Sequence, residues 1–269
     1  MAIDSFKKVL WEAGLITEFR KTSVAELIST KPVRTDGSKV IFNRLTTGDI
    51  KDYTGNIEWD NVTTTPIDLV FDKKKYFAMT MDDLDKVQSV KDVMQDTIAD
   101  EAAKLKEVED TDFFITVAAG AGETIGKSKA IVLNAKNVYD NIVDLGTKLS
   151  KKKVPKVNRY VVVDAEILGL LAKDDRFTRN PVVLENGIVE GQKINGLQVV
   201  ESEELPADTI IAMHKSGSGF GRQLQETEAL RLQSAFADGV RGLDVYGSIV
   251  LRKEAVVALK YSLEVAPQV

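Results

Sequence analysis

The longest regular pattern of hydrophobic positions lies in the second quarter of the chain. Over about 82–118, apolar residues recur at spacings of three and four, which is the repeat of an amphipathic helix. The residues of this stripe are Leu84, Val87, Val90, Met94, Ile98, Ala102, Leu105 and Val108. Thr80 and Asp83 resemble a capping pair at its start, and Gly120 and Gly122 end it. A helix of this length is roughly 55 Å long, so it either runs along an elongated molecule or forms a coiled coil.

A ribbon of two extended arms is predicted on the N-terminal side of this helix. "SKVIFNRLTT" at 38–47 alternates apolar and polar positions, and "DLVFDKKKYFAMT" at 68–80 is rich in β-branched and aromatic residues. An isolated two-stranded ribbon is marginally stable in water, so this one either folds back on its own domain or finds another partner surface. The residues before it, 1–37, form short amphipathic pieces with polar breaks, and we expect them to lie along something else.

Shorter elements follow the long helix and set the fold class. A second helix is predicted over about 134–150. The segment at 158–177, "NRYVVVDAEILGLLAKDDRF", predicts a strand and then a short helix capped by Asp164. Strand pieces lie in 191–215, and the tail at 242–266 holds two β-branched runs around a short polar break. Because there is no alternating βαβ series and no internal repeat, the pattern predicts a mixed α+β chain.

Composition narrows the class of protein without naming a function. The 269 residues suffice for one large domain or two modest ones, and a net charge of −5 argues against a dedicated binder of duplex DNA. The absence of cysteine excludes disulfides and thiolate metal sites. The N-terminus is not a secretory signal, and no apolar stretch is long enough to span a bilayer. These features predict a soluble product of the cytosol.

The segment 212–225, "AMHKSGSGFGRQLQ", raises the question of a nucleotide site. Its glycines, Gly217, Gly219 and Gly221, stand at alternate positions among basic residues, as in loops that cradle phosphate. A dinucleotide or P-loop site needs a helix directly after the glycines, whereas residues 220–227 alternate with the period of a strand. The segment therefore predicts a turn or a strand edge rather than a phosphate site.

The sequence offers equally little evidence for other catalytic or binding sites. His214 is the single imidazole, and although Ser216 and Ser218 lie near it, no nucleophile elbow surrounds them. No cluster of acids and histidine has the spacing of a metal site. The basic stretch 148–159 either contacts nucleic-acid backbone or complements the dipole at the end of a helix. We expect no catalytic residue, no cofactor and no metal, and hence no enzyme.

The order of these parts resembles the major capsid protein of tailed double-stranded DNA bacteriophages, the Hong Kong 97-type fold. The most specific resemblance lies in 210–260, where "FADGVRG" (236–242), "YGSIVL" (246–251) and "KEAV" (253–256) follow one another. On this resemblance the chain divides into an N-terminal arm (1–37), an extended loop (38–81), a peripheral domain with a long spine helix (82–155), an axial domain (156–238) and a return to the peripheral domain (239–269).

The resemblance implies a structural protein of the virion. Copies are expected to form pentamers and hexamers that close into an icosahedral shell around double-stranded DNA, without sequence-specific contacts. Assembly is expected in the host cytoplasm, through a procapsid with a portal and a separate scaffolding protein, and without a membrane. The extended loop, with Lys51, Tyr53, Ile57 and Trp59, is expected to lie over the adjacent subunit. Lys51 is a conceivable cross-linking donor, but no asparagine or glutamate partner is matched, so no cross-link is expected.

The resemblance also places the glycine segment and names the competing functions. Gly217, Gly219 and Gly221 are expected to be permissive backbone in the axial domain, close to where subunits meet around an axis. One alternative is an encapsulin-type shell that encloses cargo enzymes and has a similar length and a Glu-Ala pair before its last strand. The alternative from another class is a nucleotide-binding enzyme that uses the loop at 217–221.

Overall fold

The structure is a computed structural model, and it describes residues 23–32, 34–36, 39–46, 50, 52, 55, 59–61, 63–82, 93–177, 187–232 and 237–264. The helices in these ranges are α2 (Val24–Ile28), α4 (Val93–Ala119), α5 (Val138–Lys151) and α6 (Ala165–Ala172), with the 3-10 turns η1 (Lys215–Gly217) and η2 (Lys253–Ala255). The strands are β1 (Arg34–Asp36), β2 (Lys39–Thr46), β3 (Thr63–Val70), β4 (Lys73–Asp82), β5 (Glu123–Ile125), β6 (Ile131–Leu133), β7 (Arg159–Val163), β8 (Ile188–Ile194), β9 (Leu197–Glu201), β10 (Thr209–His214), β11 (Ser218–Arg231), β12 (Ala237–Val250) and β13 (Val256–Leu263).

A seven-stranded mixed sheet forms the broadest part of the molecule. Its strands lie in the order β5-β13-β10-β7-β9-β8, and β6 also pairs with β13. Because side chains alternate across a strand, Val161 and Val163 of β7 join the core under α5 and α6, whereas Val162 joins the core with α2 and α4. Both faces of the sheet are therefore covered by helices. This explains the run of three valines, 161–163, that ends β7, because a strand buried on both faces needs consecutive apolar residues.

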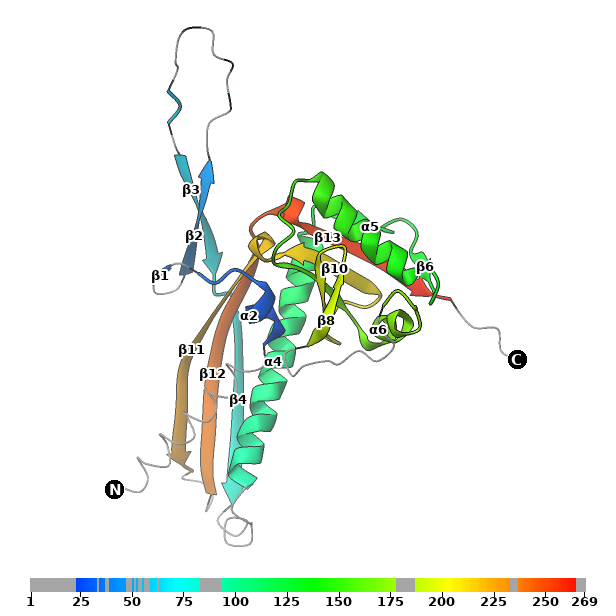
Figure 1. The fold of residues 1–269 in the computed structure, drawn as a ribbon. Coiled ribbons are helices and arrows are strands. Elements are labelled where there is room, and N and C mark those ends of the chain that lie inside the picture. The colour runs from blue at the N-terminus through cyan, green and yellow to red at the C-terminus, as the bar shows by residue number, and fades with distance from the viewer. Residues whose placement is uncertain are drawn as a thin grey trace, which may run out of the picture.

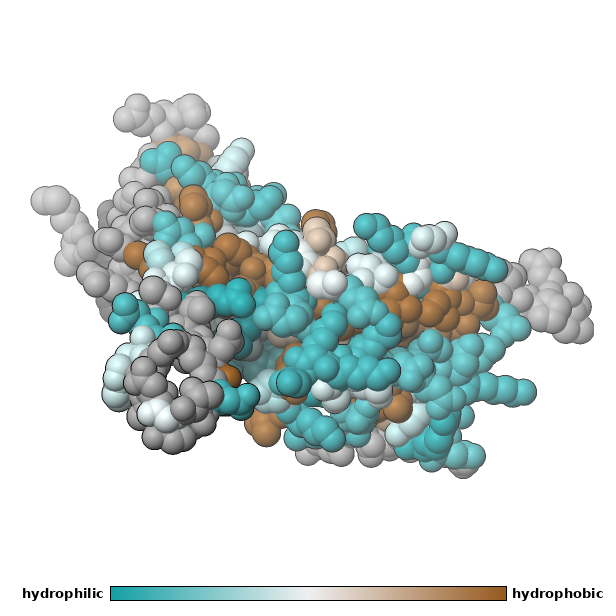
Figure 2. All heavy atoms as spheres, turned by 90° about the horizontal axis from the view of Figure 1, so that it is seen from above, coloured by the Kyte–Doolittle hydropathy of each residue, from teal (hydrophilic) through white to brown (hydrophobic). Residues whose placement is uncertain are grey.

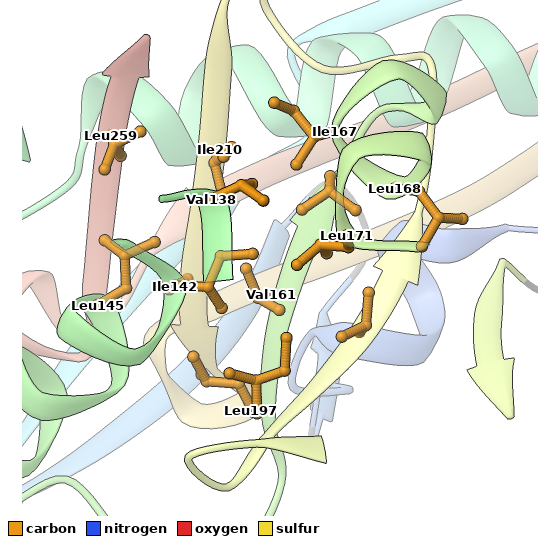
Figure 3. Packing of buried hydrophobic residues seen from close by; sticks show 14 of the residues in the cluster. Val138, Ile142, Leu145, Val161, Ile167, Leu168, Leu171, Leu197, Ile210 and Leu259 are labelled. Atoms are coloured by element: carbon orange, nitrogen blue, oxygen red, sulfur yellow. The ribbon is translucent and has the colours of Figure 1, made fainter. Parts of the chain in front are cut away.

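The core between α5, α6 and this sheet follows directly from the helical repeats. Val138, Ile142 and Leu145 of α5 lie at spacings of four and three and face the strands, as Figure 3 shows. Asp164 caps α6, where its Oδ1 accepts a hydrogen bond from the N–H of Ile167 at 2.8 Å. The predicted helix over 134–150 and the predicted cap at Asp164 are both confirmed.

A second, long sheet extends away from the first and carries α4 along it. β12 pairs with β11 on one side and with β4 on the other, both antiparallel. In Figure 1, α4 runs beside these strands and continues behind the seven-stranded sheet. α4 has 27 residues and is thus roughly 40 Å long. One helix therefore packs against two sheets, through β12 and β13, and this supports the prediction of an elongated molecule.

The third sheet is a hairpin that projects from the junction of the other two (Figure 1). β2 pairs with β3 in antiparallel register from Lys39↔Val70 to Thr46↔Thr63, and β1 adds to the outer side of β2. The predicted second arm at 68–80 is divided between two sheets. Its first residues end β3, and the rest forms β4, which belongs to the long sheet. The turn at Phe71 and Asp72 separates the two strands.

The predicted start of the long helix is wrong. Thr80 was expected to cap a helix, but β4 continues to Asp82, where it pairs with Ala237. Asp83 lies outside the described residues, and the helix is described from Val93 to Ala119. A cross-strand partner more than 150 residues away decided the conformation here, and local spacing cannot reveal such a partner.

The hydrophobic cores and sheets join segments that lie in different predicted domains. α5 was assigned to the peripheral domain at 82–155, and β13 to the return segment at 239–269. In the structure both share one hydrophobic core with β7, β9 and β10. β11, which lies in the predicted axial domain at 156–238, pairs in the long sheet with β12, and β12 pairs with β4. Within the described residues, no helix is long and apolar enough to cross a membrane.

Candidate functional site

The glycine segment opens a strand, as its periodicity predicts. Residues Lys215–Gly217 form the short turn η1, and β11 begins at Ser218. The N–H groups of this stretch are therefore not arrayed at the start of a long helix, which is the geometry that binds pyrophosphate. The proposed nucleotide loop at 217–221 is not supported by this geometry.

These glycines serve close packing. All three are buried, and a Cβ on Gly219 would lie 2.7 Å from Cζ of Phe42 in the hairpin. A Cβ on Gly221 would lie 3.1 Å from Cε1 of Phe71, and one on Gly217 would lie 2.9 Å from Cγ2 of Val256. None of the three has a positive φ. The expected conformational permissiveness is thus not used, and the missing side chains leave room for the root of the hairpin and for the first residues of β13.

His214 has a local structural role in the same segment. Its Nδ1 accepts a hydrogen bond from the N–H of Ser216 at 3.1 Å, and the Ser216 hydroxyl lies 2.8 Å from the same nitrogen. Burial lowers the pKa of the imidazole. A neutral ring that accepts at Nδ1 caps the turn η1, and this accounts for the residue without catalysis.

The hairpin has a buried root and an exposed far end. Val40, Phe42, Leu69 and Phe71 pack at the root against the long sheet. Near the other end, Ile50 and Trp59 are almost fully exposed. Lys51, Tyr53 and Ile57, which were expected to contact a neighbouring subunit, lie outside the described residues. Sequence reasoning missed Ile50, although its position beside Lys51 in the same polar loop was a usable signal.

Viewed from the end at which the hairpin projects, the described surface is mostly hydrophilic, with separate hydrophobic patches (Figure 2). Large apolar side chains that project into water on an extended ribbon are typical of surfaces that contact another molecule. Trp59, with 89% of its side chain exposed, is the described residue at which this geometry agrees best with the predicted contact.

A buried polar cluster lies where α4 crosses the long sheet. Glu109 and Asp244 are both fully buried, and Arg222 of β11 places Nη1 3.3 Å from Oε2 of Glu109. Burial raises the pKa of both carboxyl groups. The predicted apolar stripe of the helix ran through Val108, but that residue is 39% exposed, and Glu109 takes the inward position. The prediction was wrong at this turn because it followed hydrophobicity alone.

Neighbouring acids of α4 fasten other elements to the helix. Asp110 accepts hydrogen bonds from the Ser23 hydroxyl at 3.1 Å and from the N–H groups of Val24 and Ala25 at 3.2 and 3.0 Å, so it holds the start of α2. The Tyr246 hydroxyl of β12 donates to Asp112 at 2.6 Å. The described residues contain no group of three or more acids or histidine able to hold a metal ion.

The chain is similar to known phage proteins in sequence and in fold. Residues 65–259 match the model of a family described as phage capsid protein. No curated protein matches the chain. Among solved structures, one described as Mycobacterium phage Che8 is 25% identical with a TM-score of 0.67, and the match covers 88% of this chain and 91% of that chain.

Two further solved structures share the fold at lower identity. The capsid structure of the Cyanophage P-SCSP1u is 14% identical with a TM-score of 0.67, over 88% of this chain and 87% of that chain. The asymmetric unit of the bacteriophage PhiM1 mature capsid is 17% identical with a TM-score of 0.62, over 91% and 88% of the two chains. The similarity extends beyond the 65–259 match and includes most of the three sheets.

Proposed function

Because the chain belongs to the phage capsid protein family, a family of structural proteins, we propose that it forms pentamers and hexamers that close into an icosahedral shell around double-stranded DNA. The observation that carries the proposal is the projecting hairpin. It exposes Ile50 and Trp59, whereas the buried side chains among its described residues lie at the root. An extended ribbon of this kind gains a large contact area when it lies over another copy.

The arrangement of the three sheets suggests a role for each region. We propose that the seven-stranded sheet with α5 and α6 points toward the axis of each capsomer. The long sheet with α4 then forms the periphery, and the hairpin lies over the adjacent subunit. A separate scaffolding protein and a portal would guide assembly in the host cytoplasm. The packaged DNA would be contacted without sequence specificity.

Electron microscopy of the full-length chain tests the proposal. The protein is expressed alone and together with the candidate scaffolding protein of the same phage, and is examined in negative stain. We expect closed shells, or rings of five and six copies. A uniform population of small monomers under both conditions would contradict the proposal.

The contents of the shells separate the proposed function from its nearest alternative. Shells isolated from infected cells are treated with nuclease and then opened. We expect protected double-stranded DNA, whereas a co-purifying enzyme in place of DNA would indicate an encapsulin-type compartment. On denaturing gels the shells are expected to run as monomers, and a ladder of larger species would reveal cross-linked chains.

A further inference from the structure

Two acidic side chains face each other inside the protein, one on α4 and one on β12. Glu109 and Asp244 are both 0% exposed. Within the described part of the chain, Oε1 of Glu109 and both carboxyl oxygens of Asp244 have no hydrogen-bond partner of ordinary geometry. Besides the opposing carboxyl group, the backbone N–H of Val245 interacts with the Asp244 carboxylate. Buried polar atoms are nearly always satisfied in folded proteins. Two ionised carboxylates cannot satisfy each other, because each only accepts hydrogen bonds.

The charges around the pair leave it short of one positive charge. Arg222 contacts Glu109, but its other terminal nitrogen lies 3.6 Å from Oε2 of Glu26 on α2, so its single charge is divided between two acids. Other titratable groups near the pair include Asp110, Asp112 and Lys106 of α4, Tyr246 of β12 and Lys75 of β4. Lys75 stands opposite Asp244 in the strand register, but its side chain is exposed.

A proton fits this deficit better than a metal ion does. A metal site built from carboxylates needs further ligands, and the described residues offer no third acid or histidine for it. The guanidinium of Arg222 already occupies one side of Glu109. A single proton, in contrast, turns one carboxylate into a donor and removes the repulsion between like charges. The pKa of Glu109 lies well above its usual range, chiefly because the carboxyl group is buried. The charge of Arg222 lowers this pKa, and the charge of Asp244 raises it.

We propose that Glu109 and Asp244 hold one proton between them at neutral pH, that this proton fastens α4 to the long sheet, and that the attachment weakens as the solution becomes alkaline. The resulting hydrogen bond joins the helix to β12, while Arg222 extends the network to β11 and α2. This inference goes beyond the proposed shell and does not depend on it, because every group in the network belongs to one chain.

The direction of the pH effect follows from proton linkage. In the unfolded chain Glu109 ionises near its ordinary value of 4.5, whereas in the folded chain the pair keeps its proton. Unfolding at neutral pH therefore releases one proton, and a rise in pH favours the unfolded state. One linked proton changes the unfolding equilibrium constant about tenfold for each pH unit. Burial also raises the pKa of Asp110. Because Asp110 is retained in every variant, its contribution to the pH dependence of unfolding is the same in all of them.

The test compares Glu109→Gln and Asp244→Asn with the full-length wild-type chain. Either amide supplies the missing donor permanently and preserves the shape of the side chain. The control is Glu107→Gln, an exposed position two residues away on the same helix. Urea unfolding is measured at several values between about pH 6 and pH 9, and infrared spectra record the carbonyl band of a protonated carboxylic acid at about pH 8.

We expect the unfolding equilibrium constant of the wild type and of Glu107→Gln to rise about tenfold more per pH unit than that of Glu109→Gln. At the alkaline end, Glu109→Gln should be the more stable protein. The infrared band of the pair should be present in the wild type, and the band should be weaker in both amide variants, which retain Asp110. Equal pH slopes in all proteins, or a wild type without the band, would overturn the proposal. Should one amide variant fail to fold, the other variant and the wild-type band still decide the question.

Discussion

The seven-stranded sheet and the projecting hairpin differ in how side-chain packing stabilises them. The sheet is covered on both faces by helices of its own chain, and its core includes Ile142, Leu145 and Val161. The hairpin has β-ladder hydrogen bonds, but the buried side chains among its described residues, Phe42 and Leu69 included, lie at the root. The first region is thus stabilised by its own contacts. The second packs against its own chain at the root, and the described residues Ile50 and Trp59 beyond it are exposed.

The largest effect that separates the two regions is expected from Leu145→Ala in α5. Leu145 is fully buried between the helix and the sheet, and replacing a buried leucine by alanine costs about 2–5 kcal/mol. Urea unfolding followed by circular dichroism measures the loss. The matched control is Val132→Ala on β6, whose side chain is 48% exposed and whose truncation should cost about 0.5 kcal/mol or less. Equal losses at the two positions would mean that α5 does not share the core of the sheet.

A smaller and more local effect is expected from Gly219→Ala at the root of the hairpin. The new methyl group would lie 2.7 Å from the ring of Phe42, so either the ring or β11 must move. Overpacking of this kind costs about 1–3 kcal/mol. It should also raise the rate of proteolytic cleavage within the hairpin, because the root loosens.

The control for that substitution is Gly239→Ala on the neighbouring strand β12. There the added Cβ would meet Cδ2 of Leu232 at 3.5 Å, an ordinary contact distance. Its cleavage pattern should match that of the wild type. If Gly219→Ala also left the pattern unchanged, the packing of Phe42 on β11 would not be what positions the hairpin.

The parts of this fold that the sequence predicted are those in which a local pattern decides the structure. The repeat of α5, the cap at Asp164 and the strand period after Gly221 all depend on residues a few positions apart. The strand that ends at Asp82 could not be predicted in this way, because its conformation is set by pairing with β12. The packing of Phe42 over Gly219 joins residues from two different sheets and leaves no local signal.

The inward position of Glu109 on α4 was missed for a different reason. Leu105, Phe113 and Val117 recur at multiples of four and mark the inward face, and Glu109 occupies the same series. A search for hydrophobic residues passes over it and selects Val108 instead. The usable signal was an acidic residue on the apolar series of a long helix. Such a residue must find a partner inside the protein or change its protonation state.

The smallest effect on folding, and the most direct test of the contrast between the two regions, is expected from Trp59→Ala. Its side chain is 89% exposed, so the free energy of unfolding should change by about 0.5 kcal/mol or less. If the hairpin lies over another copy, the same substitution should reduce the yield of closed shells, because aromatic side chains contribute strongly to protein interfaces. Unfolding and shell yield are measured on the same preparation. A loss of folding stability with unchanged yield would show that Trp59 packs against its own chain. The hairpin would then resemble the sheet in being stabilised from within, and the contrast between the two regions would fail.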